Sequence, residues 1–218
     1  MLFDPHIHSK YSIYDSASEV GDIIDKAREL GLGAIAISDH DEIQGSLKAV
    51  GSPGKGLIAV SSTEVGSADG HILALGVKER IEPGLSAEET VKIIHKLGGL
   101  AIAAHPYDTL RSGVGDLCWK LDFDAIEVNG HCLYGNGDAE DAAKKHRRPL
   151  IGGSDAHALD EIANICTEVE GKTAEEILGN IKAGRCSVVY RKGVFSLKAS
   201  ILAGKVSRKL RRGKASEL

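Results

Sequence analysis

The sequence predicts an α/β fold in which a largely parallel sheet is covered by helices, and two observations support this. Short apolar runs, such as AIAI at 34–37 and LAIAA at 100–104, are hydrophobic throughout, as strands buried on both faces are. Stretches with helical spacing separate most of these runs, and repeated β-then-α units favour parallel strands with helices outside. A closed barrel and an open doubly wound sheet both fit this pattern. No Gly-rich phosphate loop follows the first run, which weighs against a nucleotide-binding open sheet.

The elements of this fold can be assigned along the chain. Eight apolar runs have the length of strands: residues 2–8, 34–38, 57–61, 72–76, 100–104, 125–129, 150–153 and 187–191. Three helices are expected to begin at capping boxes, in which a hydroxyl and a Glu three residues later bind the first backbone N–H groups. These boxes are Ser16 with Glu19, Ser86 with Glu89, and Thr173 with Glu176. A glycine ends each of these helices, and a fourth helix is expected over 138–146.

The chain is expected to form a single domain over residues 1–218, because no linker or low-complexity segment interrupts it. No apolar run approaches the roughly 20 residues that a membrane span needs. The first residues lack the basic and apolar regions of an export signal. The four cysteines form no Cys-x-x-Cys pair, so we expect reduced thiols in a cytoplasmic protein.

Charge is distributed unevenly along the chain. The net charge is −4, yet the stretch from residue 182 to the end contains eleven Lys or Arg residues and one acid. Residues 196–218 are predicted to form a basic helical tail whose apolar face packs on the barrel. That face consists of Leu197, Ile201, Leu202, Val206 and Leu210. Contact of this tail with nucleic acid or anionic lipid is the weaker alternative, because no aromatic residue follows Phe195.

Residues of the metal-ligand types gather where the expected strands end. They are His8, Asp39, His40, Glu64, His105, Asp155 and His157. In a β/α barrel the C-terminal ends of the strands converge on one mouth, so these side chains are expected to meet. His71 stands just before a strand and would reach the same mouth from the loop after Glu64.

Two pairs of these residues have the spacing of metal ligands on a strand. His6 and His8 are two residues apart and would share one face, and Asp155 with His157 repeats this geometry. Imidazole and carboxylate together suit Zn, Mn or Fe, with Mg as an alternative, better than Ca. The candidates outnumber the ligands of one ion. We therefore expect two or three divalent ions, with Glu64 suited to bridge a pair.

The chain resembles the PHP family, named for polymerase and histidinol phosphatase, over most of residues 2–190. The segments that carry the resemblance are FDPHIHSKYSIYDS, AISDHDEIQG, STEV, GHILALG, AAHP and GGSDAH. The resemblance implies a distorted (β/α)7 barrel, similar to a TIM barrel, with a trinuclear site. The ligands that it implies are His6, His8, Glu64 and Asp155 for one ion, Glu64, His71 and His105 for a second, and Asp15, His40 and His157 for a third.

The function expected is that of a metal-dependent phosphoesterase. A metal-activated hydroxide would attack a small phosphomonoester or nucleotide, and Asp155 or His157 would handle the proton of the leaving group. Related phosphatases carry a basic residue shortly after the A-H-P segment, whereas here the nearest base is Arg111. Arg111 is therefore the first candidate for the catalytic cation that holds phosphate, ahead of Lys10 and Arg185.

Two other functions fit parts of the sequence. A nuclease, or another protein that acts on nucleic acid, would use the basic tail. A metal-dependent amidohydrolase also carries His-x-His on its first strand, but that class bridges its metals with a lysine where this chain offers Glu64. Asp39 and Asp41 are expected to support ligands or start a helix, and Glu127, Asn129 and His131 are expected to edge the site.

Overall fold

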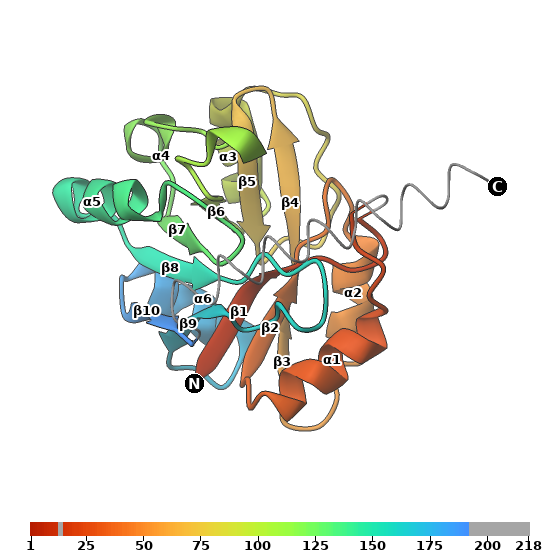
Figure 1. Cartoon of the computed structure of the whole chain (residues 1–218). Coiled ribbons are helices and arrows are strands. Elements are labelled where there is room, and N and C mark those ends of the chain that lie inside the picture. The colour runs from red at the N-terminus through yellow and green to blue at the C-terminus, as the bar shows by residue number, and fades with distance from the viewer. Residues whose placement is uncertain (13–14, 192–218) are drawn as a thin grey trace, which may run out of the picture.

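The computed structural model describes residues 1–12 and 15–191, so the tail predicted at 196–218 lies outside the described residues. Within the described part of the chain, the strands form two five-stranded sheets (Figure 1). The first sheet has the order β10-β9-β1-β2-β3, with β1 at Leu2–Ile7, β2 at Ala34–Ile37, β3 at Ile58–Val60, β9 at Ile165–Val169 and β10 at Cys186–Tyr190. The second has the order β4-β5-β6-β7-β8, with β4 at Ser62–Ser67, β5 at Gly70–Leu75, β6 at Leu100–Ala103, β7 at Ala125–Asn129 and β8 at Leu150–Gly153.

Strand pairing is mixed rather than largely parallel. The pairs β1–β2, β2–β3, β6–β7 and β7–β8 are parallel, as predicted, whereas β9 joins β1 and β10, and β5 joins β4 and β6, in antiparallel fashion. Two isolated parallel bridges, Ile7 with Ala156 and His40 with Glu64, connect the two sheets. The α/β class is thus confirmed. A closed seven-stranded barrel is not, because pairing among the described strands gives two separate sheets.

Two strands were not predicted. β4, with the sequence STEVGS, lacks the apolar run that marks a buried strand, although its first four residues are buried. Its register against β5 pairs Glu64 with Leu73, so a hairpin holds it in place rather than a hydrophobic pattern. β9, with the sequence ICTEV, is short and follows an irregular loop. Both strands are antiparallel to a neighbour, which explains why a reading based on β/α alternation missed them.

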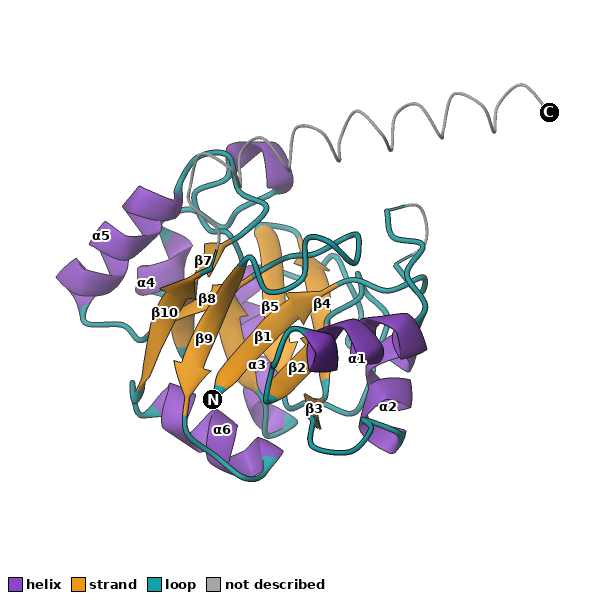
Figure 2. Cartoon of the chain, turned by 60° about the horizontal axis from the view of Figure 1, so that its bottom comes forward, coloured by secondary structure: helices purple, strands orange, loops and turns teal. Residues whose placement is uncertain are grey.

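Helices lie outside the strands (Figure 2). They are α1 at Val20–Glu29, α2 at Gln44–Gly51, α3 at Ala87–Lys96, α4 at Leu117–Lys120, α5 at Asn136–His146 and α6 at Ala174–Lys182, with a 3-10 turn at Thr109–Arg111. α2, α4 and the 3-10 turn were not predicted. The longest helix among the described residues has 11 residues, and none of them is long and apolar enough to cross a membrane.

Of the three predicted capping boxes, only one is complete. At the start of α3 the Ser86 side chain accepts from the Glu89 N–H while the Glu89 carboxylate accepts from the Ser86 N–H. At α6 the Thr173 hydroxyl accepts from the Glu176 N–H, but the Glu176 carboxylate binds the N–H of Lys172. The box at Ser16 is wrong. The Ser16 hydroxyl donates to the His8 carbonyl instead, because the segment that follows β1 lies close to it.

One of the apolar clusters between the strands closes one end of the molecule. Phe3, Leu75 and Ile102 lie in one cluster with Ile177 and Ile181 of α6. This helix therefore covers the end at which β1 begins. The opposite end, where β1, β2 and β8 finish, carries buried polar residues rather than apolar ones, and the candidate site lies there.

Candidate metal centre

His6 in β1 and His8 directly after it lie side by side, as their spacing predicts. Nε2 of His6 is 3.1 Å from Nε2 of His8, and these atoms lie 3.2 and 3.3 Å from Oε2 of Glu64. Both rings are buried, while Ile7 between them packs into a separate apolar cluster. Burial opposes the charged form of His8, but the carboxylates of Asp155 and Glu64 raise its pKa to about 9. The two rings thus share one acidic environment.

Glu64 stands at the centre of the cluster with no exposed surface. Its Oε2 is 3.1 Å from Nδ1 of His40, and its Oε1 is 3.1 Å from Nδ1 of His71 and from Nε2 of His105. Burial alone would raise the pKa of this carboxyl, but His40, His6 and His71 hold it well below its usual range. A carboxylate whose two oxygens face different sets of imidazoles has the arrangement needed to bridge two cations.

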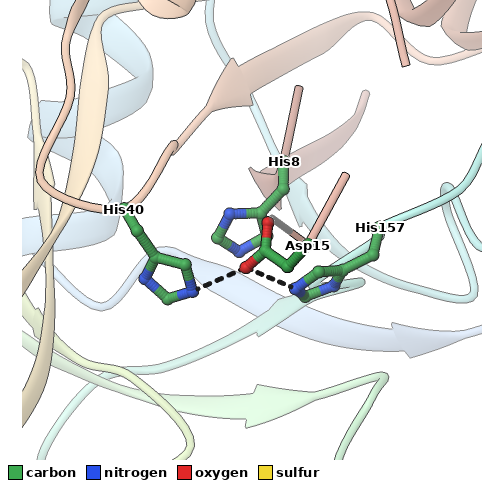
Figure 3. Close-up of side chains that lie close together, drawn as sticks. All are labelled: His8, Asp15, His40 and His157. Atoms are coloured by element: carbon green, nitrogen blue, oxygen red, sulfur yellow. Dashed lines mark ion pairs between the residues drawn. The ribbon is translucent and has the colours of Figure 1, made fainter. Parts of the chain in front are cut away.

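A second group forms around Asp15 (Figure 3). Its Oδ2 lies 3.2 Å from Nε2 of His40 and 3.5 Å from Nε2 of His157, and the ring of His8 stands next to them. Burial opposes ionisation of Asp15, but His157, His40 and His8 lower its pKa below its usual range. Nδ1 of His157 donates to the Asp155 carbonyl at 2.8 Å, which leaves Nε2 free of its proton for the group around Asp15.

Two site residues have backbone conformations that are rare for residues other than glycine. Asp155 has φ 53° and His105 has φ 31°. Such conformations cost of the order of 1–3 kcal/mol each and concentrate at functional sites. The turn at Asp155 directs its carboxylate toward the two histidines, since Oδ1 lies 3.1 Å from Nε2 of His8 and 3.6 Å from Nε2 of His6. The strained backbone at Asp155 therefore brings a ligand-type carboxylate into the cluster.

Only one of the three candidate phosphate-binding cations lies in the site. Arg111, on the 3-10 turn after β6, forms an ion pair with Oδ2 of Asp155, and its side chain is largely buried. Lys10 pairs with Glu19 in an exposed position. Arg185 lines a cavity beside Met1, at the end of the molecule where β1 begins.

Glu127 accepts hydrogen bonds from two of the ligand-type histidines, a role that was not predicted for it from the sequence. Its Oε1 accepts from Nδ1 of His6 at 2.9 Å, and its Oε2 accepts from the His105 N–H at 3.0 Å and from Nδ2 of Asn129 at 2.8 Å. Because a carboxylate can only accept, Nδ1 of His6 carries the proton and Nε2 offers its lone pair to the cluster. The sequence did contain a signal: Glu127 and Asn129 are two residues apart on a strand.

Two more supporting residues come from loops and carry no sequence signal. The Ser12 hydroxyl lies 2.9 Å from Nδ1 of His8 and accepts from the His40 N–H at 3.0 Å. The Glu161 carboxylate accepts from the N–H groups of His157 and Ala158 at 2.8 and 3.1 Å. Neither position has a periodic pattern around it, so only the fold brings them to the ligands.

The remaining acids near the ligands hold backbone in place. Asp39 accepts from both the N–H and the hydroxyl of Ser9 at 2.6 and 2.7 Å, and Asp41 accepts from the Gly66 N–H at 2.8 Å. Asp4 accepts from the Ser154 N–H at 3.0 Å. These acids fasten the loops from which the ligand-type residues project.

The residues present could hold metal ions. All nine candidates named from the sequence lie at this end of the molecule, and four overlapping groups have ligand atoms within 4.8 Å of one another: His6, His8 and Glu64; His40, Glu64 and His71; His8, Asp15, His40 and His157; and His131, Asp155 and His157. In the described chain, Oδ1 of Asp15, Nδ1 of His105 and Oδ1 of Asp155 are buried with no hydrogen-bond partner. Such atoms are rare, and cations would satisfy the two carboxylate oxygens.

Two models of known protein families match parts of this chain. The model of the PHP domain family matches residues 4–110, and a PHP-associated model matches residues 134–186. An uncharacterized protein of Methanocaldococcus jannaschii is 37% identical over 138 residues, which is 59% of this chain and 81% of that protein. The DNA polymerase III subunit alpha of Borreliella burgdorferi is 42% identical over 43 residues, which is 20% of this chain and only 4% of the polymerase.

Solved structures share the fold at low sequence identity. PsfC from Pseudomonas syringae has a TM-score of 0.73 at 17% identity, over 95% of this chain and 97% of that one. A two-domain protein from Bacteroides vulgatus, described as containing a predicted PHP-like metal-dependent phosphoesterase, has a TM-score of 0.69 at 18% identity, over 87% of this chain and 64% of that one. Endonuclease Q, solved with a duplex carrying an abasic lesion, has a TM-score of 0.61 at 22% identity, over 84% of this chain and 57% of that one. At these identities the likeness shows the fold alone.

Proposed function

Because the chain belongs to the PHP domain family, we propose that it is a metal-dependent phosphoesterase that hydrolyses small phosphomonoesters or nucleotides at a site of two or three divalent ions. The observation that carries this proposal is a single cluster of nine imidazoles and carboxylates, with one arginine inside it. Imidazole with carboxylate suits Zn, Mn or Fe, and a buried guanidinium suits a phosphate group.

The ligand groups divide among the proposed ions as follows. His6, His8, Glu64 and Asp155 would hold one ion, Glu64, His71 and His105 a second, and Asp15, His40 and His157 a third. Bound divalent ions would lower the pKa of a water molecule and neutralise charge on phosphoryl oxygens. Glu64 supports this division because its two oxygens face different imidazoles.

The chain's own residues would bind and orient the substrate. Arg111 would take phosphoryl oxygens through its guanidinium, which already lies against the Asp155 carboxylate. Asp155 or His157 would handle the proton on the leaving-group oxygen, and Nδ1 of His157 lies 3.5 Å from Oδ1 of Asp155. Lys10 and Arg185 instead contact Glu19 and Asn180 on the surface, which favours Arg111 for the phosphate-binding role.

The test compares substrates on one preparation. Metal-loaded protein is assayed against phosphomonoesters, phosphodiesters, nucleotides and cyclic amides, with bound metal measured by elemental analysis. We expect turnover of phosphomonoesters or nucleotides, loss of turnover in His8→Ala, and a raised KM for phosphate esters in Arg111→Met. Hydrolysis of cyclic amides alone would make the protein an amidohydrolase. No phosphoester turnover by protein with a full complement of metal would refute the proposal.

Nuclease activity is the second candidate, and a specific observation favours it: the stretch from residue 182 to the end holds eleven basic residues and one acid, as a site for a nucleic-acid backbone would. The test measures cleavage of oligonucleotides by the full chain and by a chain that ends before Arg208. Loss of oligonucleotide cleavage with unchanged hydrolysis of small esters would assign the protein to this class. If the full chain and the shortened chain hydrolyse each substrate at the same rate, the tail has no catalytic role.

A further inference from the structure

A histidine outside the nine candidates is built into the site. His131 follows β7, is 4% exposed, and its backbone N–H is held by the side-chain oxygen of Asn129 at 2.9 Å. Its Nδ1 lies 3.1 Å from the carbonyl oxygen of Asp155, 24 residues away in sequence. Because a carbonyl oxygen can only accept, Nδ1 of His131 carries the proton and donates to it.

The Asp155 carbonyl therefore accepts from two imidazoles. His157 donates to it at 2.8 Å and His131 at 3.1 Å, and the two rings meet edge to face with centroids 5.0 Å apart. The bond from His157 is local to the Asp155–His157 turn. The bond from His131 is the one that ties this carbonyl to the segment after β7.

We propose that His131 is a positioning residue that fixes the Asp155–His157 turn, and through it the ion group formed by His8, Asp15, His40 and His157. This rests on the metal binding of the proposed function. The role of His131 is to donate through Nδ1 to the backbone carbonyl of a turn that carries two ligand-type residues, and hydrogen-bond partners outside the ligands set the ligands' orientation.

The reason that this tie matters is the conformation of Asp155. At φ 53° its backbone is in the left-handed region, which is strained for a residue with a side chain. Such a turn persists only when its surroundings determine it. The peptide after Asp155 is also held by the bond from the Ala156 N–H to the His6 carbonyl at 3.3 Å, so loss of the donor on His131 would leave it held on one side only and able to turn. Nε2 of His157 would then leave its position 3.5 Å from Oδ2 of Asp15.

A different role for His131 would use a different ring atom. His131 also belongs to a group with Asp155 and His157 whose ligand atoms lie within 4.8 Å of one another. With Nδ1 engaged by the carbonyl, direct ligation would have to use Nε2. The two roles can be separated, because an asparagine amide places its nitrogen near the position of Nδ1, and a glutamine amide places it near that of Nε2.

The experiment measures ions bound per chain in the full-length protein, after dialysis against Zn²⁺ or Mn²⁺ and elemental analysis, together with the affinity of the weakest ion. We expect wild type and His131→Asn to bind the same number of ions. His131→Gln and His131→Ala should lose one ion or bind it about 10–100-fold more weakly. Full binding by His131→Gln with loss in His131→Asn would overturn the proposal in favour of ligation through Nε2. Full binding by His131→Ala would also overturn it.

A folding defect is separated from a positioning effect by the metal-free proteins. The asparagine and glutamine variants both lose the ring and differ only in the reach of one amide, so we expect equal thermal midpoints without metal and different ion counts with it. An ion count that follows the metal-free thermal midpoint across all three variants would overturn the proposal. Wild-type protein that binds ions but hydrolyses no phosphoester would refute the proposed function and leave this comparison intact, whereas wild-type protein that binds no ion refutes both.

Discussion

Replacement of Glu127 by Gln tests whether the residues behind the ligands set the chemistry of the site. Glu127 is fully buried and accepts three hydrogen bonds, from Nδ1 of His6, from the His105 N–H and from Nδ2 of Asn129. Glutamine has the same shape but only one acceptor oxygen. Two of the donors share Oε2, so the glutamine oxygen should stay there and its NH₂ group should face His6.

The magnitude follows from the tautomer of His6. An NH₂ group opposite Nδ1 requires that nitrogen to accept, so the proton must move to Nε2. That is the atom 3.1 Å from His8 and 3.2 Å from Glu64, and with a proton it cannot bind a metal. Loss of such a supporting carboxylate costs about 10–100-fold in metal affinity. Loss of a hydrogen bond to a charged acceptor costs about 1.5–3 kcal/mol of folding free energy.

The assay is a competition titration of Zn²⁺ against a chromophoric chelator, with urea unfolding of the metal-free protein alongside. The matched control is Glu88→Gln on α3, where an exposed carboxylate pairs with Lys92, and it should change neither measurement. The reasoning would be refuted if Glu127→Gln bound Zn²⁺ as tightly as wild type. An equal loss of affinity in Glu127→Gln and Glu88→Gln would show that total charge, rather than the tautomer of His6, sets the affinity.

Three further predictions concern packing, capping and metal removal. Gly45→Ala places a methyl group against Oδ2 of Asp39 and 2.7 Å from the Ser9 hydroxyl, so urea unfolding should show a loss of about 1–3 kcal/mol. The control Gly21→Ala meets no atom within 4 Å and should gain about 0.5–1 kcal/mol; the opposite order of stabilities would contradict this reading. Ser86→Ala removes the cap of α3 and should cost about 1 kcal/mol in the same measurement, and an unchanged denaturant midpoint would contradict it. Metal at about 100 times its Kd should add ~2.7 kcal/mol to stability, so chelation should lower the thermal midpoint, whereas a midpoint insensitive to chelator would argue against a metal site.

The sequence predicted those parts of the fold that carry a repeating pattern. β7 and β8 have the expected bounds, and six other apolar runs coincide with strands to within two residues at each end. Residues at the ends of these strands, such as His8, His40 and His105, meet because parallel strands finish at one edge. The i and i+2 spacing of His6 and His8 placed both rings on one side of β1. Periodicity and strand ends are local properties, and they survive folding.

What the sequence could not predict depends on contacts between distant segments. β4 carries the central Glu64 but has no apolar run, and its place is set by pairing with β5. Residues 16–19 have the letters of a capping box, yet a nearby carbonyl of His8 takes the Ser16 hydroxyl. Ser12 and Glu161 support ligands from loops. In each case a partner more than a few residues away outweighs the local preference.

The two-sheet architecture gives the metal cluster a structural consequence. His6 lies in β1 of the first sheet and His8 directly follows it, while Glu64 lies in β4 of the second sheet and His105 follows β6. Within the described chain only two isolated bridges, at Ile7–Ala156 and at His40–Glu64, join the sheets by backbone pairing, and both adjoin ligand-type residues. An ion bound to histidines of one sheet and to Glu64 of the other would add a cross-link beside the isolated bridges that join the two sheets. Metal should therefore protect the amides of β1 and β4 from hydrogen exchange more than those of β10, which lies at the far edge of the first sheet.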